Sequence, residues 1–125
     1  MEAQINKPIV TKEWLATRIQ QDPNKIIGRA LVAIYKNQTP TEQSTISTLQ
    51  LNGIGFSKAD ARVGTIGARM FNSHGTLQEW VVKVWSRPTK DGFPRICKYA
   101  NQLQSIAQAK KDRMNHAKPF NLVII

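Results

Sequence analysis

The sequence predicts a mostly α-helical protein, a single compact domain of about six helices followed by a short apolar C-terminal tail. The chain has 125 residues, a length that can bury one hydrophobic core. Its apolar residues recur three and four positions apart, which is the period of an amphipathic helix. Proline, glycine and capping residues separate these periodic stretches. We assign residues 1–113 to the helical domain and residues 114–125 to the tail.

The first two helices are predicted in the N-terminal third of the chain. Thr11 is a typical N-cap residue for a helix that begins at Lys12. Asp22 is the expected cap of the second helix, since Pro23 then occupies the first helical position, where a missing N–H is tolerated. The first helix is predicted to carry on one face Trp14, Leu15, Arg18 and Ile19. The second is predicted to bury Ile27, Ala30, Leu31, Ile34 and Tyr35.

The third and fourth helices are predicted on either side of the segment NGIGF. Thr39 and Glu42 have the spacing of a capping box, which predicts a short third helix that ends near Thr48. Ser57 is the expected N-cap of the fourth helix, and Gly75 is expected to end it. The fourth helix is predicted to bury Val63, Ile66, Gly67, Met70 and Phe71.

The fifth and sixth helices are predicted on either side of a turn-rich loop, RPTKDGFPR. Thr76 and Glu79 form a second capping box, and Pro88 is expected to end the fifth helix. Gly92 lies at the tip of the loop, and Pro94 is expected to start the sixth helix. The fifth helix is predicted to bury Leu77, Trp80, Val81, Val84 and Trp85. The sixth is predicted to bury Ile96, Tyr99, Ala100, Leu103, Ile106 and Ala107.

Three small residues have predicted packing roles. Gly64 and Gly67 lie near the apolar stripe of the fourth helix, which indicates that another helix approaches closely there. Cys97 is the one cysteine of the chain, so it forms no internal disulfide. Its place on an apolar helix face predicts a small core residue in a reducing compartment.

The charge of the chain is its most informative property. Eighteen Lys and Arg residues against eight Asp and Glu residues give a formal net charge of +10. The excess is concentrated in the C-terminal half, since residues 62–125 hold eleven of the bases and three of the acids. A field of one sign on part of a small domain attracts polyanions, so the sequence predicts a nucleic-acid partner, DNA or RNA.

Enzymatic, metal and membrane functions are not predicted. His74, His116 and Cys97 are too scattered to form a metal site or a catalytic pair with a known spacing, and no cofactor is expected. No apolar run approaches the roughly 20 residues that span a bilayer, so no membrane partner is expected. The acidic and polar N-terminus lacks an export signal, and we expect a cytoplasmic, non-enzymatic protein.

The best candidate for a nucleic-acid interface is a basic cluster around the loop RPTKDGFPR. Aromatic side chains lie among its cations, as in proteins that stack bases while they hold phosphates. The predicted binding residues of this cluster are Lys83, Arg87, Lys90, Phe93, Arg95 and Lys98. Lys58 and Arg62, at the start of the fourth helix, are further candidates because free N–H groups at a helix N-terminus receive phosphate.

The segment NGIGF admits three interpretations. Gly53 and Gly55 can adopt positive φ in a sharp reversal between two helices, with Phe56 packed on Ala61. The same loop could instead bind a phosphate, or present Phe56 to a base. A helix-turn-helix made of the fourth and fifth helices is also open, although Phe71 stands where the motif usually has a small residue.

Two ordered motifs resemble a known module. They are N-G-x-G-F-x-x-x-D-A, at residues 52–61, and K-Y-x-x-Q-L, at residues 98–103. Together they resemble a small helical module of bacteriophage and mobile-element proteins, sometimes fused to helicase-like DNA-processing enzymes. The resemblance covers roughly residues 25–108. It implies a phage or mobile-element context and a role in nucleic-acid processing, and it implies no catalytic residues.

The sequence therefore predicts a small basic phage or mobile-element protein that binds DNA or RNA largely through phosphate contacts. The alternative is a protein-interaction module that inhibits or recruits a host nucleic-acid-handling complex, in counter-defence or as a replication accessory. In that case the apolar tail at residues 114–125 is the expected contact segment.

Overall fold

The computed structural model describes residues 10–37 and 55–116. Within these ranges the chain forms helices α1 (Lys12–Gln21), α2 (Pro23–Lys36), α4 (Ala61–His74), α5 (Glu79–Ser86) and α6 (Ala100–His116), with a 3-10 helix, η2 (Arg95–Tyr99), before α6. The predicted mostly helical fold is confirmed. The predicted third helix and residues 117–125 of the predicted tail lie outside the described residues.

The two N-terminal helices begin where the sequence predicts. The Thr11 side chain accepts a hydrogen bond from the N–H of Trp14, and that of Asp22 accepts one from the N–H of Lys25. Pro23 is the first residue of α2. Each cap satisfies one of the N–H groups that the first turn of a helix leaves without an internal partner.

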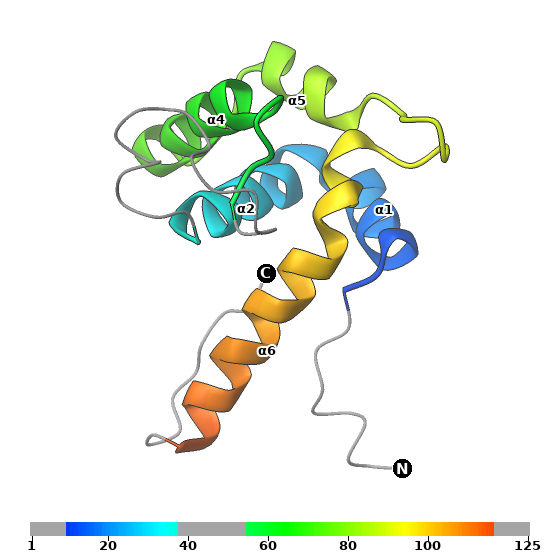
Figure 1. Cartoon of the computed structure of the whole chain (residues 1–125). Coiled ribbons are helices and arrows are strands. Elements are labelled where there is room, and N and C mark those ends of the chain that lie inside the picture. Colours follow the sequence, from blue (N-terminus) through cyan, green and yellow to red (C-terminus); the bar gives the residue numbers. More distant parts are fainter. Residues whose placement is uncertain (1–9, 38–54, 117–125) are drawn as a thin grey trace.

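Helix α2 is central to the described structure. It packs against α1, α4, α5 and α6, and its closest neighbour is α4, which lies across it (Figure 1). Its predicted stripe is largely confirmed, because Ile27, Ala30, Leu31 and Ile34 are buried, while Tyr35 is half-buried. The core of the protein forms around this helix.

The buried face of α4 differs from the predicted one. The side chains that turn inward are small, namely those of Ala61, Gly64, Thr65, Gly67 and Ala68. Val63, Ile66, Met70 and Phe71 are only half-buried at the flanks of this face, which corrects the predicted stripe. The predicted close approach is present, because a Cβ at Gly67 would lie 2.7 Å from Leu31 of α2. Neighbouring large side chains occupy the inner space, so α4 can contribute only small ones.

Two predicted helix caps are wrong for the same physical reason. Helix α4 begins at Ala61, and the Ser57 hydroxyl is instead hydrogen-bonded to the Tyr99 hydroxyl at 3.3 Å. Helix α5 begins at Glu79, and the Thr76 hydroxyl bonds the side chain of Asn24 in α2. Both hydroxyl groups thus bond residues that are distant in the sequence, rather than the N–H groups at the start of their own helices.

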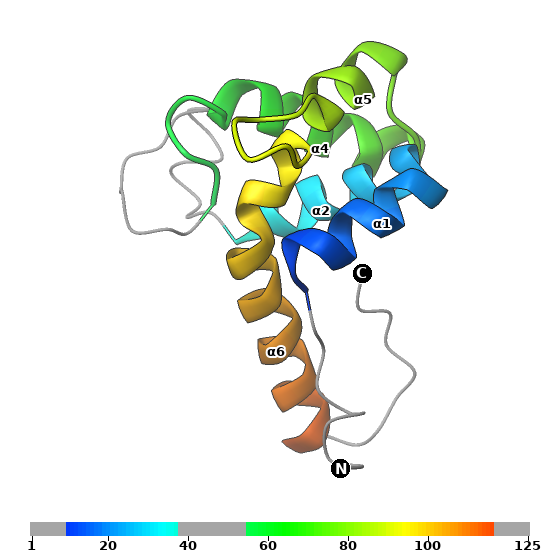
Figure 2. The ribbon, with the colours of Figure 1, turned by 90° about the vertical axis from the view of Figure 1, so that its right-hand side faces the viewer.

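The loop between α5 and η2 is a tight hairpin. Pro88 ends α5 as predicted, and the N–H of Thr89 donates to the carbonyl of Phe93 at 2.9 Å. Gly92 has φ +84, so glycine suits the tip. Below the tip, the N–H of Arg95 donates to the carbonyl of Arg87. The hairpin therefore brings the two ends of the basic loop side by side (Figure 2).

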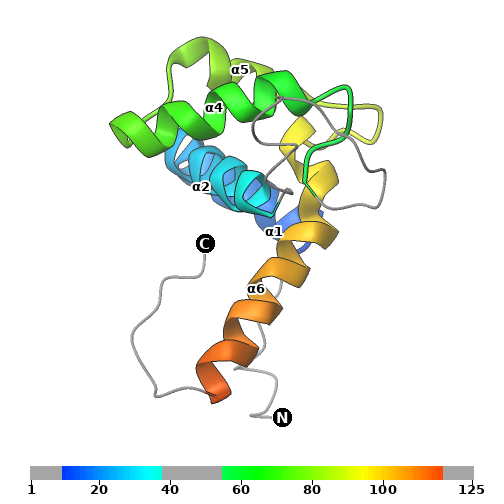
Figure 3. The same ribbon diagram turned by 60° about the vertical axis from the view of Figure 1, so that its left-hand side comes forward.

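Helix α6 continues from η2 and leaves the other helices. Its first part is buried, with Leu103 and Ala107 in the core. Its C-terminal part projects beyond the other described helices in all three views (Figure 1, Figure 2 and Figure 3). As predicted, Pro94 precedes the helical segment, although the first five helical residues form the 3-10 helix η2.

We predict that Gly64→Ala destabilises the protein, although alanine is the better helix former by about 1 kcal/mol. A Cβ at Gly64 would lie 2.5 Å from the ring of Phe56, which is fully buried and cannot move aside. Overpacking of this kind lowers the free energy of unfolding by about 1–3 kcal/mol, measurable by urea unfolding with circular dichroism. Ser73→Ala, at an exposed position of α4, is the control. A Gly64→Ala variant more stable than the wild type would contradict the packing.

Candidate functional site

The site is organised by one buried carboxylate, that of Asp60, which is 0% exposed. Lys98 Nζ lies 2.5 Å from its Oδ2, and the Tyr99 hydroxyl donates to the same oxygen at 2.6 Å. The Arg95 guanidinium bonds its Oδ1. Asp60 precedes the first residue of α4, yet its side chain makes no cap, because η2 occupies both of its oxygens.

The electrostatics of this cluster follow from burial and pairing. Burial by itself raises the pKa of Asp60, but the bonds from Lys98, Tyr99 and Arg95 outweigh it and hold the pKa below its ordinary value of 3.8. Burial and the hydrogen bond to Asp60 both raise the pKa of Tyr99, so its hydroxyl remains a donor at neutral pH. Asp60 is therefore a charged structural anchor rather than a proton carrier.

The loop before α4 is fastened to the same helices. The N–H of Gly55 donates to the side chain of Gln102 at 2.6 Å, and Gln102 donates back to the carbonyl of Gly55 at 3.0 Å. The N–H of Ser57 donates to the Tyr99 hydroxyl at 3.0 Å. Gly55 has φ +83, as the structural-turn interpretation requires. These two N–H groups already have acceptors and are not free to bind a phosphate. The predicted phosphate contact at the start of α4, beside Lys58 and Arg62, stays a prediction.

The aromatic residues near Asp60 are part of the core. Phe56 is buried against Trp85 and Tyr99, with ring centroids 6.0 and 5.8 Å away. The indole of Trp85 is fully buried beneath the Arg95 guanidinium, 5.1 Å from its centroid. Phe93 is half-buried against the core. Neither Phe56 nor Trp85 offers a free face on which a base could stack.

The two motifs singled out in the sequence meet at this point. Gly55, Phe56 and Asp60 come from the first motif, and each contacts Tyr99 or Gln102 from the second. The two motifs of this chain thus form the tertiary contacts between the loop before α4 and the segment from η2 to the start of α6.

The predicted binding cations fall into three groups. Arg95 and Lys98 are ion-paired with Asp60 but remain partly exposed, at 30% and 41% of their side chains. Lys83 is paired with Glu79 at 3.7 Å on the exposed face of α5. Within the described ranges the remaining four are exposed and have no ion-pair partner: Lys58, Arg62, Arg87 and Lys90.

The ion pairs of Asp60 with Arg95 and Lys98 link the two segments that carry these cations, which are distant in the sequence. Lys58 and Arg62 lie two residues on either side of Asp60, while Arg87 and Lys90 lie on the hairpin that leads to Arg95. The acid at the hairpin tip, Asp91, is itself neutralised by Lys12 of α1 at 2.6 Å.

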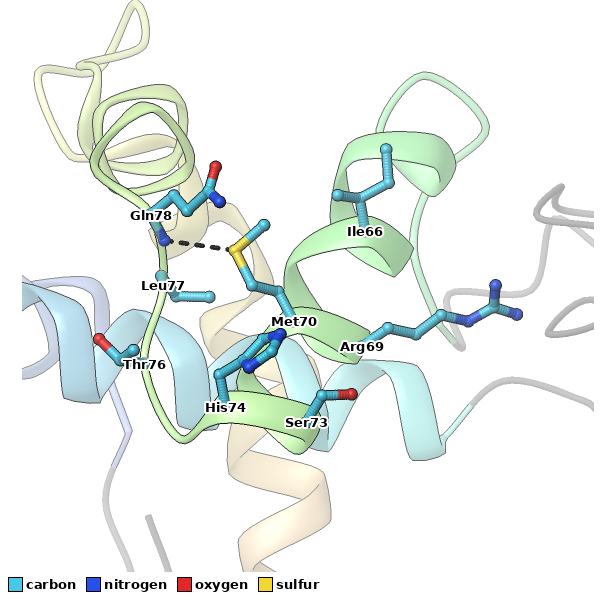
Figure 4. Close-up of a pocket in the computed structure, with 8 residues that line it drawn as sticks. All are labelled: Ile66, Arg69, Met70, Ser73, His74, Thr76, Leu77 and Gln78. Carbon is cyan, nitrogen blue, oxygen red and sulfur yellow. Dashed lines mark hydrogen bonds between the residues drawn. The ribbon is translucent and has the colours of Figure 1, made fainter.

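A second feature, missed by the sequence analysis, is an apolar groove between α4 and the turn that leads to α5. It has a volume of about 630 Å³ and is lined by Ile66, Arg69, Met70, Ser73, His74, Thr76, Leu77 and Gln78 (Figure 4). Trp80, predicted to be buried, is 45% exposed, and its Nε1–H donates to the side chain of Gln78 on the groove wall. The short α5 buries Val81 and Trp85 instead, so Trp80 is turned outward.

The remaining candidate chemistry is sparse in residues 10–37 and 55–116. No group of three or more His, Cys, Asp or Glu side chains there could hold a metal ion. Cys97 is buried as predicted, and burial raises the pKa of its thiol to about 11. No helix in the same ranges is long and apolar enough to cross a membrane.

We predict that Asp60→Asn lowers the free energy of unfolding by about 3 kcal/mol, the lower end for breaking a buried ion pair, because its cations stay partly hydrated. Glu79→Gln breaks an exposed pair instead and should cost less than about 1 kcal/mol. Both are measured by denaturant unfolding. Equal effects of the two substitutions would contradict the anchoring role of Asp60.

The comparison of wild type with Asp60→Asn also gives a pH prediction. Because the folded-state pKa of Asp60 is lowered, its contribution is complete above its ordinary value of 3.8 and is lost as the pH falls through the lowered value. The difference in unfolding free energy between wild type and Asp60→Asn should therefore be constant from neutrality to about pH 5 and shrink in stronger acid. A difference that stays constant down to acid unfolding would contradict the lowered pKa.

Comparison with known proteins gives no functional assignment, since no family model, no curated protein and no solved structure matches the chain significantly.

Proposed function

We propose that this protein is a non-enzymatic, nucleic-acid-binding protein. Its proposed interface is the basic surface formed by Lys58, Arg62, Arg87 and Lys90 together with the exposed parts of Arg95 and Lys98. The observation that carries the proposal is the pairing of Asp60 with η2, which joins two cationic segments around a single buried carboxylate. Of these residues, the four that have no ion-pair partner in the described ranges are the proposed phosphate ligands: Lys58, Arg62, Arg87 and Lys90.

The proposed binding mode rests on charge rather than on base reading. A cationic side chain that neutralises a phosphate releases counterions, so affinity falls as salt rises and varies little with sequence. The burial of Phe56 and Trp85 also favours phosphate contacts over stacking, leaving the half-buried Phe93 as the one aromatic candidate of the cluster. The resemblance described above suggests the setting, a phage or mobile-element protein acting on DNA or RNA in the host cytoplasm.

We predict that the double variant Arg87→Ala/Lys90→Ala weakens binding to DNA or RNA in mobility-shift assays at two salt concentrations. Its slope of log affinity against log salt should flatten by about 0.7–0.9 for each phosphate that the variant no longer neutralises. Arg95 and Lys98 are left unchanged, since their removal would unpair Asp60 and confuse binding with folding.

The matched control is Lys25→Ala/Lys111→Ala, which removes two positive charges from α2 and α6, outside the proposed interface. It should retain nearly all of the affinity. Equal decreases in affinity for both double variants would mean that only net charge matters, and an unchanged affinity in Arg87→Ala/Lys90→Ala would contradict the proposed interface.

The alternative function, a protein-interaction module for a host nucleic-acid-handling complex, is favoured by a different observation. The exposed Trp80 stands beside an apolar groove, and exposed tryptophan at a concave apolar surface is typical of binding hot spots. The cationic surface would then steer an acidic partner toward the molecule.

We predict that Trp80→Ala separates the two functions. Because its ring is largely outside the core, the substitution should change the free energy of unfolding by no more than about 0.5 kcal/mol. If the alternative is correct, the variant fails to capture a host protein that the wild type captures from a nuclease-treated lysate, while Lys83→Ala still captures it. Capture by wild type and Trp80→Ala alike would contradict a role for the groove.

A further inference from the structure

A second concave site lies on the described structure, between α2, α4 and α6. It has a volume of about 410 Å³ and is lined by Arg29, Val32, Ala33, Lys36, Phe71, Asn72 and Lys110. Pockets that hold small ligands typically enclose about 300–1,000 Å³, so the volume suits a molecule of nucleotide size. None of its lining residues belongs to the basic surface proposed above.

The helical period explains why α2 contributes four of these residues. Arg29 and Lys36 are seven positions apart, with Val32 and Ala33 between them, so all four lie along one face of the helix. Lys110 of α6 also lines the pocket. Arg29 and Lys36 place two cations along one side of the concavity, and neighbouring cations attract an anion.

An aromatic wall faces the cations. Phe71 of α4 lies directly on Gly28 of α2, because a Cβ at Gly28 would fall 2.1 Å from its ring. Because Gly28 has no side chain, the Phe71 ring can pack against the backbone of α2. The ring is still only half-buried and lines the pocket. Asn72, the next residue, adds an amide that can both donate and accept hydrogen bonds.

We propose that this pocket binds a nucleotide, with its phosphate on Arg29 and Lys36 and its base against Phe71. Cations beside an aromatic wall match a ligand that carries both a phosphate and a base. An inorganic anion would use only the cations, and an apolar ligand would use only the aromatic wall. An Arg guanidinium can donate two parallel hydrogen bonds to one phosphate group. An aromatic ring supplies a surface on which any base can stack. The nucleotide can be a free mononucleotide or one unit of a single strand.

The test is calorimetric titration of the full chain at low salt with four probes: inorganic phosphate, adenosine, adenosine 5′-monophosphate and a single-stranded oligodeoxyadenylate. Adenosine 5′-monophosphate or the oligonucleotide should bind more tightly than phosphate or adenosine. The double variant Arg29→Gln/Lys36→Gln should weaken this binding about tenfold or more for each charged hydrogen bond that it removes. Lys25→Gln, on the same helix outside the pocket, is the control and should bind like the wild type.

The two nucleotide probes identify the source of the ligand. Binding of the mononucleotide that depends on Arg29 and Lys36 indicates a free nucleotide, whereas such binding of the oligonucleotide alone indicates a strand. Phe71→Leu should reduce the preference for nucleotide over phosphate, with folding checked by circular dichroism. No binding of either nucleotide probe, or equal binding by wild type and Arg29→Gln/Lys36→Gln, would overturn the proposal.

Failure here is distinguishable from failure of the proposed function. The pocket depends on Arg29 and Lys36, and Arg87→Ala/Lys90→Ala should leave mononucleotide binding unchanged. If Arg87→Ala/Lys90→Ala weakens oligonucleotide binding and Arg29→Gln/Lys36→Gln does not, the proposed basic surface is supported and the pocket proposal fails.

Discussion

The ion pairs of Asp60 are the interaction on which the rest of this structure depends. A buried carboxylate is costly unless cations and hydrogen-bond donors compensate it, and here Arg95, Lys98 and Tyr99 all do so. These bonds fix the start of α4 against η2 and, through Gln102, hold the Gly55 loop against α6. Removing Arg95 or Lys98 would leave the buried Asp60 carboxylate with fewer charged partners, so the cluster makes this arrangement of helices specific.

The Asp60 cluster also separates cations that stabilise the fold from cations that are available for binding. A basic residue near a buried acid is part of the fold, whereas one without an ion-pair partner adds to the electrostatic field outside. Arg95 serves both purposes, since it pairs with Asp60, covers Trp85 and is still 30% exposed. The proposed interface is therefore built around a structural anchor, and experiments on its function must avoid the residues that hold the anchor.

Close approach between helices is the second constraint. Glycine is a poor helix former, but the missing side chains of Gly28 and Gly64 leave room for aromatic rings. The Phe71 ring packs on Gly28, and the Phe56 ring packs on Gly64. The first contact shapes the wall of the proposed nucleotide pocket, and the second places Phe56 beneath the loop that Tyr99 holds. Small residues on the central helices thus determine where large side chains and concave surfaces lie.

The sequence by itself determined the helical class, the caps at Thr11 and Asp22, and the end of α4 at Gly75, because these depend on neighbours a few residues away. It also indicated the basic character of the hairpin. The tertiary structure decided the features in which local rules compete with distant partners. Ser57 and Thr76 do not cap their helices, since the Ser57 hydroxyl is bonded to Tyr99 and the Thr76 hydroxyl is bonded to Asn24.

The candidate sites divide in the same way. Periodicity identified Trp85 as a core residue but also predicted burial of Trp80, because it cannot tell how wide the buried face of a short helix is. The pocket of Arg29 and Lys36 could not be predicted from the sequence, since its aromatic wall comes from α4 and another part of its lining from α6. Spacing along a chain fixes which side chains share one helix face, whereas only the packing of helices fixes which faces meet.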